Sequence, residues 1–303
     1  MLIIKYRKIF YILTALLISA SIFSISFFGL NFGIDFTGGS ILEISYPEGA
    51  PSKESIEARL KELPIGGFSL RSAGSSSAGE GFILRTKELS NDARLGVLQA
   101  LSLNETFIVK QERLNTIGPV IGNELKNKAR AAIAIVIAAF ILFIAFVFRK
   151  VSEPVSSWKY GLIAVVALLH DGLIPIGMFS ILGYLFGSEI DVLFVMALLA
   201  ILGYAVNDTI VVFDRVRENL KLNKELNRKE DFELTVGKSL SQTYTRSINT
   251  SLTTAIVLLS LFFLGSPATE DFVLVLLTGV IAGTYSSIFL ATPLLVTWSG
   301  VKN

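Results

Sequence analysis

The sequence has no cysteine and one histidine among its 303 residues, and only 17% of it is charged. Without cysteine the chain forms no disulfide and offers no thiolate metal site, and a single histidine cannot build a multi-ligand zinc centre. The net charge of +2 is small, and no basic patch interleaved with aromatic residues occurs, which argues against a nucleic-acid partner. We therefore expect no metal, no other cofactor and no nucleic acid.

The low content of charged residues is matched by a high content of apolar residues. They make up 52% of the chain, and the mean hydropathy is +0.62. An ordinary soluble domain carries about 25% charged residues. A chain this apolar cannot cover itself with a polar surface, so we expect a lipid bilayer as its solvent.

Six apolar segments are long enough to cross a hydrocarbon layer of ~30 Å, which takes about 20 helical residues. Four of them contain no charged residue, whereas the third contains His170 and Asp171 and the fourth contains Asp208. The pattern predicts an α-helical membrane protein with six spans. The segments are Ile9–Leu30, Ala131–Phe148, Tyr160–Phe186, Val192–Phe213, Ile248–Gly265 and Phe272–Trp298.

The first segment follows the basic residues Lys5, Arg7 and Lys8, as the apolar core of a cleaved signal peptide would. However, the apolar run is longer than a signal core of about 7–15 residues. No small-x-small cleavage site immediately precedes Asn31. We therefore predict a membrane-spanning helix rather than a signal peptide.

The distribution of lysine and arginine predicts the orientation, because basic residues concentrate in short cytoplasmic segments. With the N-terminus inside, the basic residues before the first span, between the second and third spans, and in the 214–246 loop all lie in the cytoplasm. The two short external turns then hold acidic residues only, Glu189 and Asp191 in one and Glu270 and Asp271 in the other. We predict that both termini are cytoplasmic.

This layout divides the chain into three parts. Residues 1–30 form the N-terminus and first span, residues 31–128 an external domain, and residues 129–303 a five-helix bundle with its cytoplasmic loop. Long external domains cross the membrane regardless of their charge, so the basic residues of the external part do not contradict the orientation.

The external part has the pattern of an α+β domain. Its predicted order of elements, βαββαβ, is that of a ferredoxin-like fold. It has no nucleotide-binding loop and no set of residues typical of a nucleophile, so we expect binding or force transmission and no enzymatic activity. The elements are a strand at 40–46, a helix at Ser52–Leu63 with Ser52 as N-cap, strands near 67–72 and 81–86 around a turn at Ala73–Gly79, a helix near 90–102 and a strand near 105–114.

Asp208 and Arg246 are the first pair of candidate functional residues. An ionisable side chain in the hydrocarbon layer costs a few kcal/mol or more and usually faces a bundle interior or a water path. Asp208 is therefore either a structural carboxylate bonded to a neighbouring helix or a proton carrier. Arg246 begins the fifth span on the same side of the membrane. It is either an anchor that reaches the head groups or a permanent charge that biases the protonation of Asp208.

His170 and Asp171 lie in the middle of the third span. Neighbours on a helix point about 100° apart, so we predict that they are not a facing pair. Packing and proton relay both fit His170. We expect Asp171 to have a polar partner, because burying a carboxylate in the membrane without one costs free energy.

Small residues recur every four positions on the last two spans. Such stripes let helix backbones approach closely and predict helix contacts. They are Ser247, Ser251 and Ala255 on the fifth span and Gly279, Gly283, Ser287 and Ala291 on the sixth.

Two stretches resemble the SecF branch of the SecD/SecF family of protein-export membrane proteins. The first is Gly33-Ile-Asp-Phe-Thr-Gly-Gly39, and the second is Asn207-Asp-Thr-Ile-Val-Val-Phe-Asp-Arg-Val-Arg-Glu-Asn219. Shorter matches occur in family order along the whole chain. The family motif residues in the two long stretches are Gly33, Asp35, Gly38, Gly39, Asn207, Thr209, Asp214 and Arg215.

The resemblance implies a subunit of the Sec protein translocase in the cell (inner) membrane. With SecD, such a subunit uses the proton motive force to promote late stages of protein translocation. The implied partners are SecD, the SecYEG channel, other accessory subunits of the translocon and the translocating polypeptide. Asp208 and Arg246 then occupy positions implicated in proton passage, with Asp171 and His170 as further members of the pathway.

Two other functions fit an intramembrane acid or a membrane bundle. One is a half-sized, proton-coupled exporter of small molecules of the resistance-nodulation-division type, which should present an external pocket of ligand size. The other is a passive scaffold that stabilises neighbouring subunits, in which neutralising Asp208 would leave the function intact.

Overall fold

The structure is a computed structural model that describes residues 2–76, 79–103, 106–147, 155–266 and 269–299. It consists of two compact units. The helical unit comprises residues 1–31 and 131–303, and the α+β unit comprises residues 32–130.

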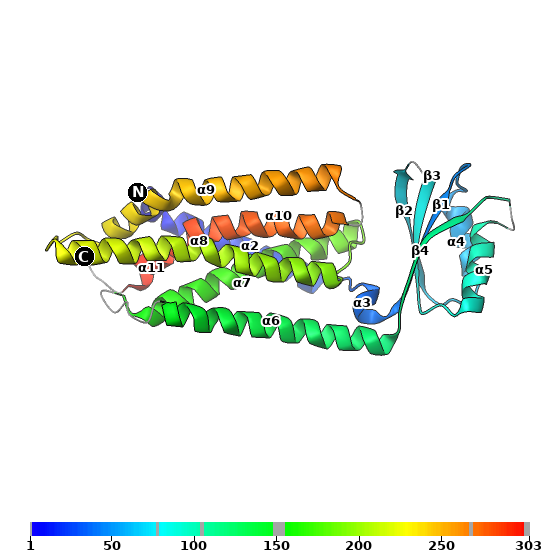
Figure 1. Cartoon of the computed structure of the whole chain (residues 1–303), viewed down its shortest axis with the longest axis horizontal. Coiled ribbons are helices and arrows are strands. Elements are labelled where there is room, and N and C mark those ends of the chain that lie inside the picture. The colour runs from blue at the N-terminus through cyan, green and yellow to red at the C-terminus, as the bar shows by residue number, and fades with distance from the viewer. Residues whose placement is uncertain (1, 77–78, 104–105, 148–154, 267–268, 300–303) are drawn as a thin grey trace. The chain divides into compact units, whose positions relative to one another are not determined.

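Six helices of the described ranges are long and apolar enough to cross a membrane, which confirms the predicted number of spans (Figure 1). The chain begins with a short helix, α1 (Leu2–Lys5), before the first of them. The six are α2 (Arg7–Phe28), α6 (Pro119–Val147), α7 (Ser157–Leu185), α8 (Val192–Glu225), α9 (Phe232–Leu264) and a last one made of α10 (Glu270–Tyr285), the π-helix η2 (Ser286–Ala291) and α11 (Thr292–Trp298).

Three helices extend well beyond their predicted spans. α6 begins at Pro119 rather than at Ala131, and its predicted last residue, Phe148, lies outside the described residues. α8 and α9 continue through most of the predicted 214–246 loop. Hydropathy marks the part of a helix that lipid covers, whereas a polar helix continues as long as its own side chains support it. Ion pairs one turn apart do so on the extension of α8, where Asp214 lies 2.9 Å from Arg217.

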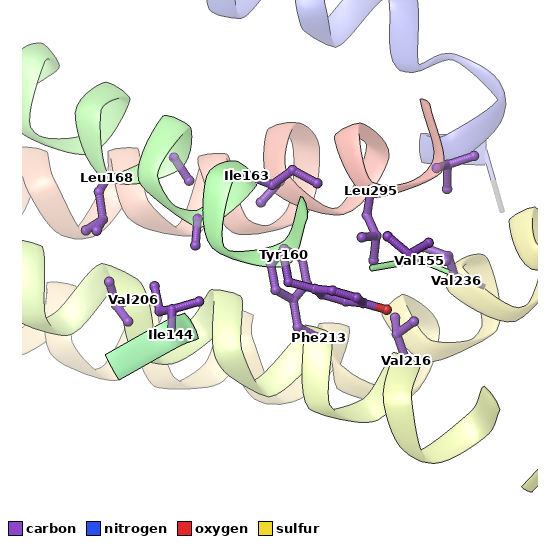
Figure 2. Packing of buried hydrophobic residues seen from close by; sticks show 14 of the residues in the cluster. Ile144, Val155, Tyr160, Ile163, Leu168, Val206, Phe213, Val216, Val236 and Leu295 are labelled. Atoms are coloured by element: carbon purple, nitrogen blue, oxygen red, sulfur yellow. The ribbon is translucent and has the colours of Figure 1, made fainter. Parts of the chain in front are cut away.

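The centre of the helical unit is formed by α7, α8 and the last span, while α2, α6 and α9 lie more exposed around it. One part of this core is an aromatic contact at the first turn of α7. The rings of Tyr160 and Phe213 meet edge to face with centroids 5.3 Å apart, and Val216, Val236 and Leu295 surround them (Figure 2). Lipid tails are as apolar as these side chains, so within the bilayer van der Waals packing holds such helices together.

Glycines bring α8 and α10 unusually close. A Cβ atom at Gly283 would lie 2.7 Å from the Cβ of Ala205, and one at Gly279 would overlap the side chain of Ile201. Both glycines belong to the small-residue stripe of the sixth span. Their contacts confirm that this stripe marks helix packing.

The α+β unit has the predicted βαββαβ order, and its sheet is antiparallel with strand order β2-β3-β1-β4. Leu42, Ile44, Leu70 and Leu84 of the sheet join apolar side chains of α4 and α5 in one core. The elements are α3 (Ile34–Thr37), β1 (Gly39–Tyr46), α4 (Lys53–Lys61), β2 (Phe68–Ser76), β3 (Gly79–Thr86), α5 (Asn91–Leu101) and β4 (Lys110–Ile117).

Local predictions in this unit were right for the helices and partly wrong for the strands. Ser52 caps α4 as expected, since its hydroxyl accepts a hydrogen bond from the Ser55 amide. β2 and β3 extend into the predicted Ala73–Gly79 turn, of which residues 77 and 78 lie outside the described residues. Pairing between neighbouring strands there overrides the weak strand preference of glycine and serine.

The last strand begins at Lys110 instead of 105, a position that lies outside the described residues. Phe107 and Val109 precede the strand and pack against the core of the unit. Their apolar pattern therefore reflects burial without strand pairing, which a sequence pattern alone does not separate from a strand.

Candidate functional site

Asp208 is buried within α8, where 5% of its surface remains exposed. The hydroxyls of Ser247 and Ser251 on α9 lie within interaction distance of its carboxylate. Among the described residues, Asp208 Oδ2 and Ser247 Oγ have no hydrogen bond of standard geometry. The carboxylate therefore faces two hydroxyl groups and keeps one oxygen available.

Arg246 precedes Ser247 on α9 and acts electrostatically on Asp208. Its side chain is exposed in this chain, and the two residues form no direct ion pair in the part of the chain that the structure describes. The structure thus brings the fourth and fifth spans together, which the sequence could not do. It places a permanent positive charge near the carboxylate without neutralising it directly.

The hydroxyl groups continue beyond Asp208 to a third helix. Thr284 of α10 donates a hydrogen bond to Ser251, with 2.5 Å between the two oxygens. Ser247 and Ser251 belong to the small-residue stripe of the fifth span, which predicted packing alone. Their hydroxyls also provide polar contacts, a role that the spacing of small residues does not reveal.

A second acid centre lies on α7. His170 Nδ1 is 2.9 Å from Asp171 Oδ1, and both side chains are almost fully buried. The prediction that they do not face each other was wrong. Both side chains are short and rotate about χ1, so their polar atoms meet across the angle between neighbouring positions, and the apolar surroundings favour that contact.

The other oxygen of Asp171 accepts a hydrogen bond of 2.9 Å from Ser286. His170 stacks on the ring of Tyr285 with centroids 5.8 Å apart, and its Nε2 has no hydrogen-bond partner among the described residues. Both contacts come from the junction of α10 and η2. The sequence showed no signal for Tyr285 or Ser286 as partners of this centre.

Ser286 is the first residue of the π-helix η2. A π-turn is wider than an α-helical turn and leaves backbone groups less regularly bonded, and such turns are frequent at functional sites. Thr292 compensates within the last span, because its hydroxyl donates to the carbonyl of Ser287 at 2.7 Å. Asp171 therefore connects α7 to an irregular turn in the last span.

The two acid centres lie on different sides of α8. Asp208 faces α9, whereas the next residue, Thr209, lines a small gap beside α7 together with Asp171 and Ala205. The gap is too narrow to admit a water molecule. In this arrangement the carboxylate of Asp208 on α8 and that of Asp171 on α7 are not connected by water through that gap.

The remaining motif residues of α8 are on or near its surface. Asn207 is exposed, Asp214 pairs with Arg217 at 2.9 Å, and Arg215 pairs with Glu218 at 2.8 Å. Exposed pairs of this kind contribute about 0.3–0.5 kcal/mol each to a helix. Their geometry indicates support of the α8 extension.

The glycine motif lies in the α+β unit. Gly33 precedes α3 as its N-cap, and Asp35 lies in the first turn of that helix. Gly38 and Gly39 have φ angles of 75° and 139°, which residues other than glycine rarely adopt. A Cβ atom at Gly38 would lie 2.8 Å from the Cα of Pro119. The motif therefore permits a tight junction between β1 and the start of α6.

Six membrane-crossing helices around buried ionisable groups, with an α+β unit between the first two, define an integral membrane protein of the transport type. The family model described as "Protein export membrane protein SecD/SecF, C-terminal" matches residues 99–301, and the "SecD/SecF GG Motif" matches residues 23–46. This chain belongs to the SecD/SecF family of protein-export membrane proteins.

Relatives along nearly the whole chain are named protein translocase subunit SecF. The one from Thermobaculum terrenum is 40% identical over 98% of this chain and 93% of its own length, and the one from Haemophilus influenzae is 36% identical over 95% and 82%.

A solved structure has the same fold. The crystal structure of SecDF, a translocon-associated membrane protein from Thermus thermophilus, matches 98% of this chain with a TM-score of 0.83 and 30% identity. This chain spans 38% of that SecDF chain.

Proposed function

We propose that this chain is a subunit of the Sec protein translocase that works with SecD and uses the proton motive force to promote late stages of protein translocation. The observation that carries the proposal is Asp208, a buried carboxylate in a membrane-crossing helix that faces two hydroxyl groups. Membership of the family supports a role in protein translocation, and Asp208 is the group that would carry the proton.

The surroundings of Asp208 suit a group that gains and loses a proton. A serine hydroxyl can donate a hydrogen bond to a carboxylate and accept one from a carboxylic acid. Ser247 and Ser251 can therefore adapt to either form of Asp208 by rotating. Such rotation limits the cost of an unsatisfied buried polar group, about 1–3 kcal/mol, in either protonation state.

The energy of the gradient is sufficient for such a cycle. One elementary charge crossing 100 mV releases about 2.3 kcal/mol. Moving a two-state equilibrium from 1:99 to 99:1 takes about 5.5 kcal/mol. A few protons per cycle can therefore drive a conformational change that acts on the translocating polypeptide.

Asp171 and His170 form a second step of the proposed proton pathway. Protonation of Asp171 would weaken its acceptance of the hydrogen bond from Ser286, which begins the π-helix. The irregular turn is thus a part of the last span that can respond to a proton.

The proposed partners are SecD, the SecYEG channel, other accessory subunits and the translocating polypeptide. We place the protein in the inner membrane with the α+β unit outside and both termini in the cytoplasm. The distribution of lysine and arginine supports this orientation. A small-molecule exporter is not favoured, because the relatives of this chain are named protein translocase subunits.

Asp208→Asn tests the proposal in vesicles that contain the cognate SecD and channel. The amide is nearly the same size but cannot carry a proton, so gradient-dependent late translocation should be lost while ATP-driven initiation continues. Asp214→Asn is the matched control, since it makes the same change on the exposed side of the same helix. A full response of the Asp208→Asn vesicles to the gradient would contradict the proposal.

A further inference from the structure

α8 and α9 are joined side by side by three rungs of side-chain hydrogen bonds, here called the polar ladder. In each rung the two residue numbers add up to the same total, as two antiparallel helices in one fixed register require. The rungs are Tyr204–Thr254 at 3.2 Å, Asn219–Ser239 at 2.8 Å and Asn223–Thr235 at 3.2 Å.

The position of Asp208 is set by this register. It lies between the Tyr204–Thr254 rung and the Asn219–Ser239 rung, so the ladder places it opposite the stretch from Ser247 to Ser251. These are the two hydroxyls that face its carboxylate. A slip of one residue along α9 moves the partner by about 1.5 Å, and a slip of one turn by about 5.4 Å. Either slip moves at least one of these two serines away from its present place beside Asp208.

The apolar contacts between the two helices do not determine the register as sharply. Val212 and Leu240 pack together with Ile248 between the rungs, and van der Waals contacts of this kind have little directional preference. Hydrogen bonds are directional and weaken steeply when their geometry is poor. The register therefore depends on the rungs.

Asn219 is the centre of the best-connected rung. Its amide donates to Ser239 Oγ and also to Gln242 Oε1 at 2.9 Å, so one side chain holds two successive turns of α9. Ser239 is fully buried and donates in turn to the Thr235 carbonyl. Loss of Asn219 leaves Ser239 without its donor in a place that water does not reach.

We infer that Asn219 and Ser239 are positioning residues, which hold α8 and α9 in the register that keeps Asp208 between Ser247 and Ser251. The inference rests on the proposed function, in which Asp208 carries protons. Neither residue touches the proton; both act through the placement of Asp208.

Spin labels measure the register directly, because the chain has no cysteine of its own. Met196→Cys on α8 and Leu234→Cys on α9 are exposed sites near opposite ends of the hairpin. Their separation follows any slide of one helix along the other. Asn219→Leu should shift or broaden the distance distribution by up to about 5 Å, one helical turn.

The functional arm uses the unlabelled protein in vesicles with SecD and the channel. Asn219→Leu should reduce gradient-dependent translocation by at least roughly fivefold, the size that one of its two hydrogen bonds supports, at an unchanged amount of protein in the membrane. The exchanged pair Asn219→Ser with Ser239→Asn restores the bond and should restore both readouts. Lys221→Leu, on the exposed side of the same helix, should change neither.

The results separate this inference from the proposed function. An unchanged distance distribution, or a lost response that the exchanged pair does not restore, would overturn the positioning role. If Asn219→Leu does not accumulate, Ser239→Ala takes its place with the same expectations. If Asp208→Asn keeps its gradient response, the proposed function fails, whereas the register measurement still decides whether the ladder sets the helix positions.

Discussion

Replacing Gly283 by alanine tests the close approach of α8 and α10. The added methyl carbon would lie 2.7 Å from the Cβ and 3.2 Å from the Cα of Ala205, well inside contact distance. Ala205 has no side-chain rotation that could relieve the overlap, so the two helices must separate. Overpacking of this kind costs about 1–3 kcal/mol. Alanine regains about 1 kcal/mol over glycine through its helix propensity.

Gly161→Ala on α7 is the matched control. The nearest atom to its new methyl carbon would be Ile144 Cγ2 at 4.0 Å, an ordinary contact, so this variant gains helix propensity without a clash. We expect Gly283→Ala to be less stable than Gly161→Ala by about 1–3 kcal/mol. The measurement is heat-induced loss of the monodisperse protein in detergent, followed by size-exclusion chromatography. Equal stability of the two variants would refute the close approach.

Two further predictions concern orientation and the α+β unit. Reporter fusions after Leu101 should read external and fusions near Leu226 and after Asn303 cytoplasmic; a cytoplasmic signal at Leu101 would overturn the proposed orientation. Residues 32–130 expressed alone should be soluble with mixed helix and strand by circular dichroism, and an unfolded spectrum would contradict an independent unit. Within it, Tyr46→Phe should cost about 1–3 kcal/mol in urea unfolding, because the buried Leu101 carbonyl loses its 2.8 Å hydrogen bond.

The positions of the spans could be predicted because the bilayer imposes a length and an apolar composition on each segment. The ends of the helices could not. α8 and α9 continue into polar sequence, where ion pairs and the ladder at Asn219 and Asn223 support them. Hydropathy carries no information about such contacts, so the 214–246 segment was predicted to be a loop.

The α+β unit shows the same division. The order of its elements follows from alternation and turn residues, and the N-cap at Ser52 from its local chemistry. The ends of β2, β3 and β4 depend on which neighbouring strand is available to pair. Strand pairing joins residues far apart in the chain, and a local pattern does not contain it.

The sequence by itself determined which ionisable residues enter the membrane, since Asp171 and Asp208 interrupt apolar runs that are otherwise long enough to span it. Only the tertiary structure decided what those residues meet. It places Ser247 and Ser251 beside Asp208, and His170 and Ser286 beside Asp171. The physical reason is that the free-energy cost of placing an ionisable side chain in the membrane depends only on that residue and its depth in the bilayer. A hydrogen-bond partner depends on helix register and rotamer, which arise only when the helices pack.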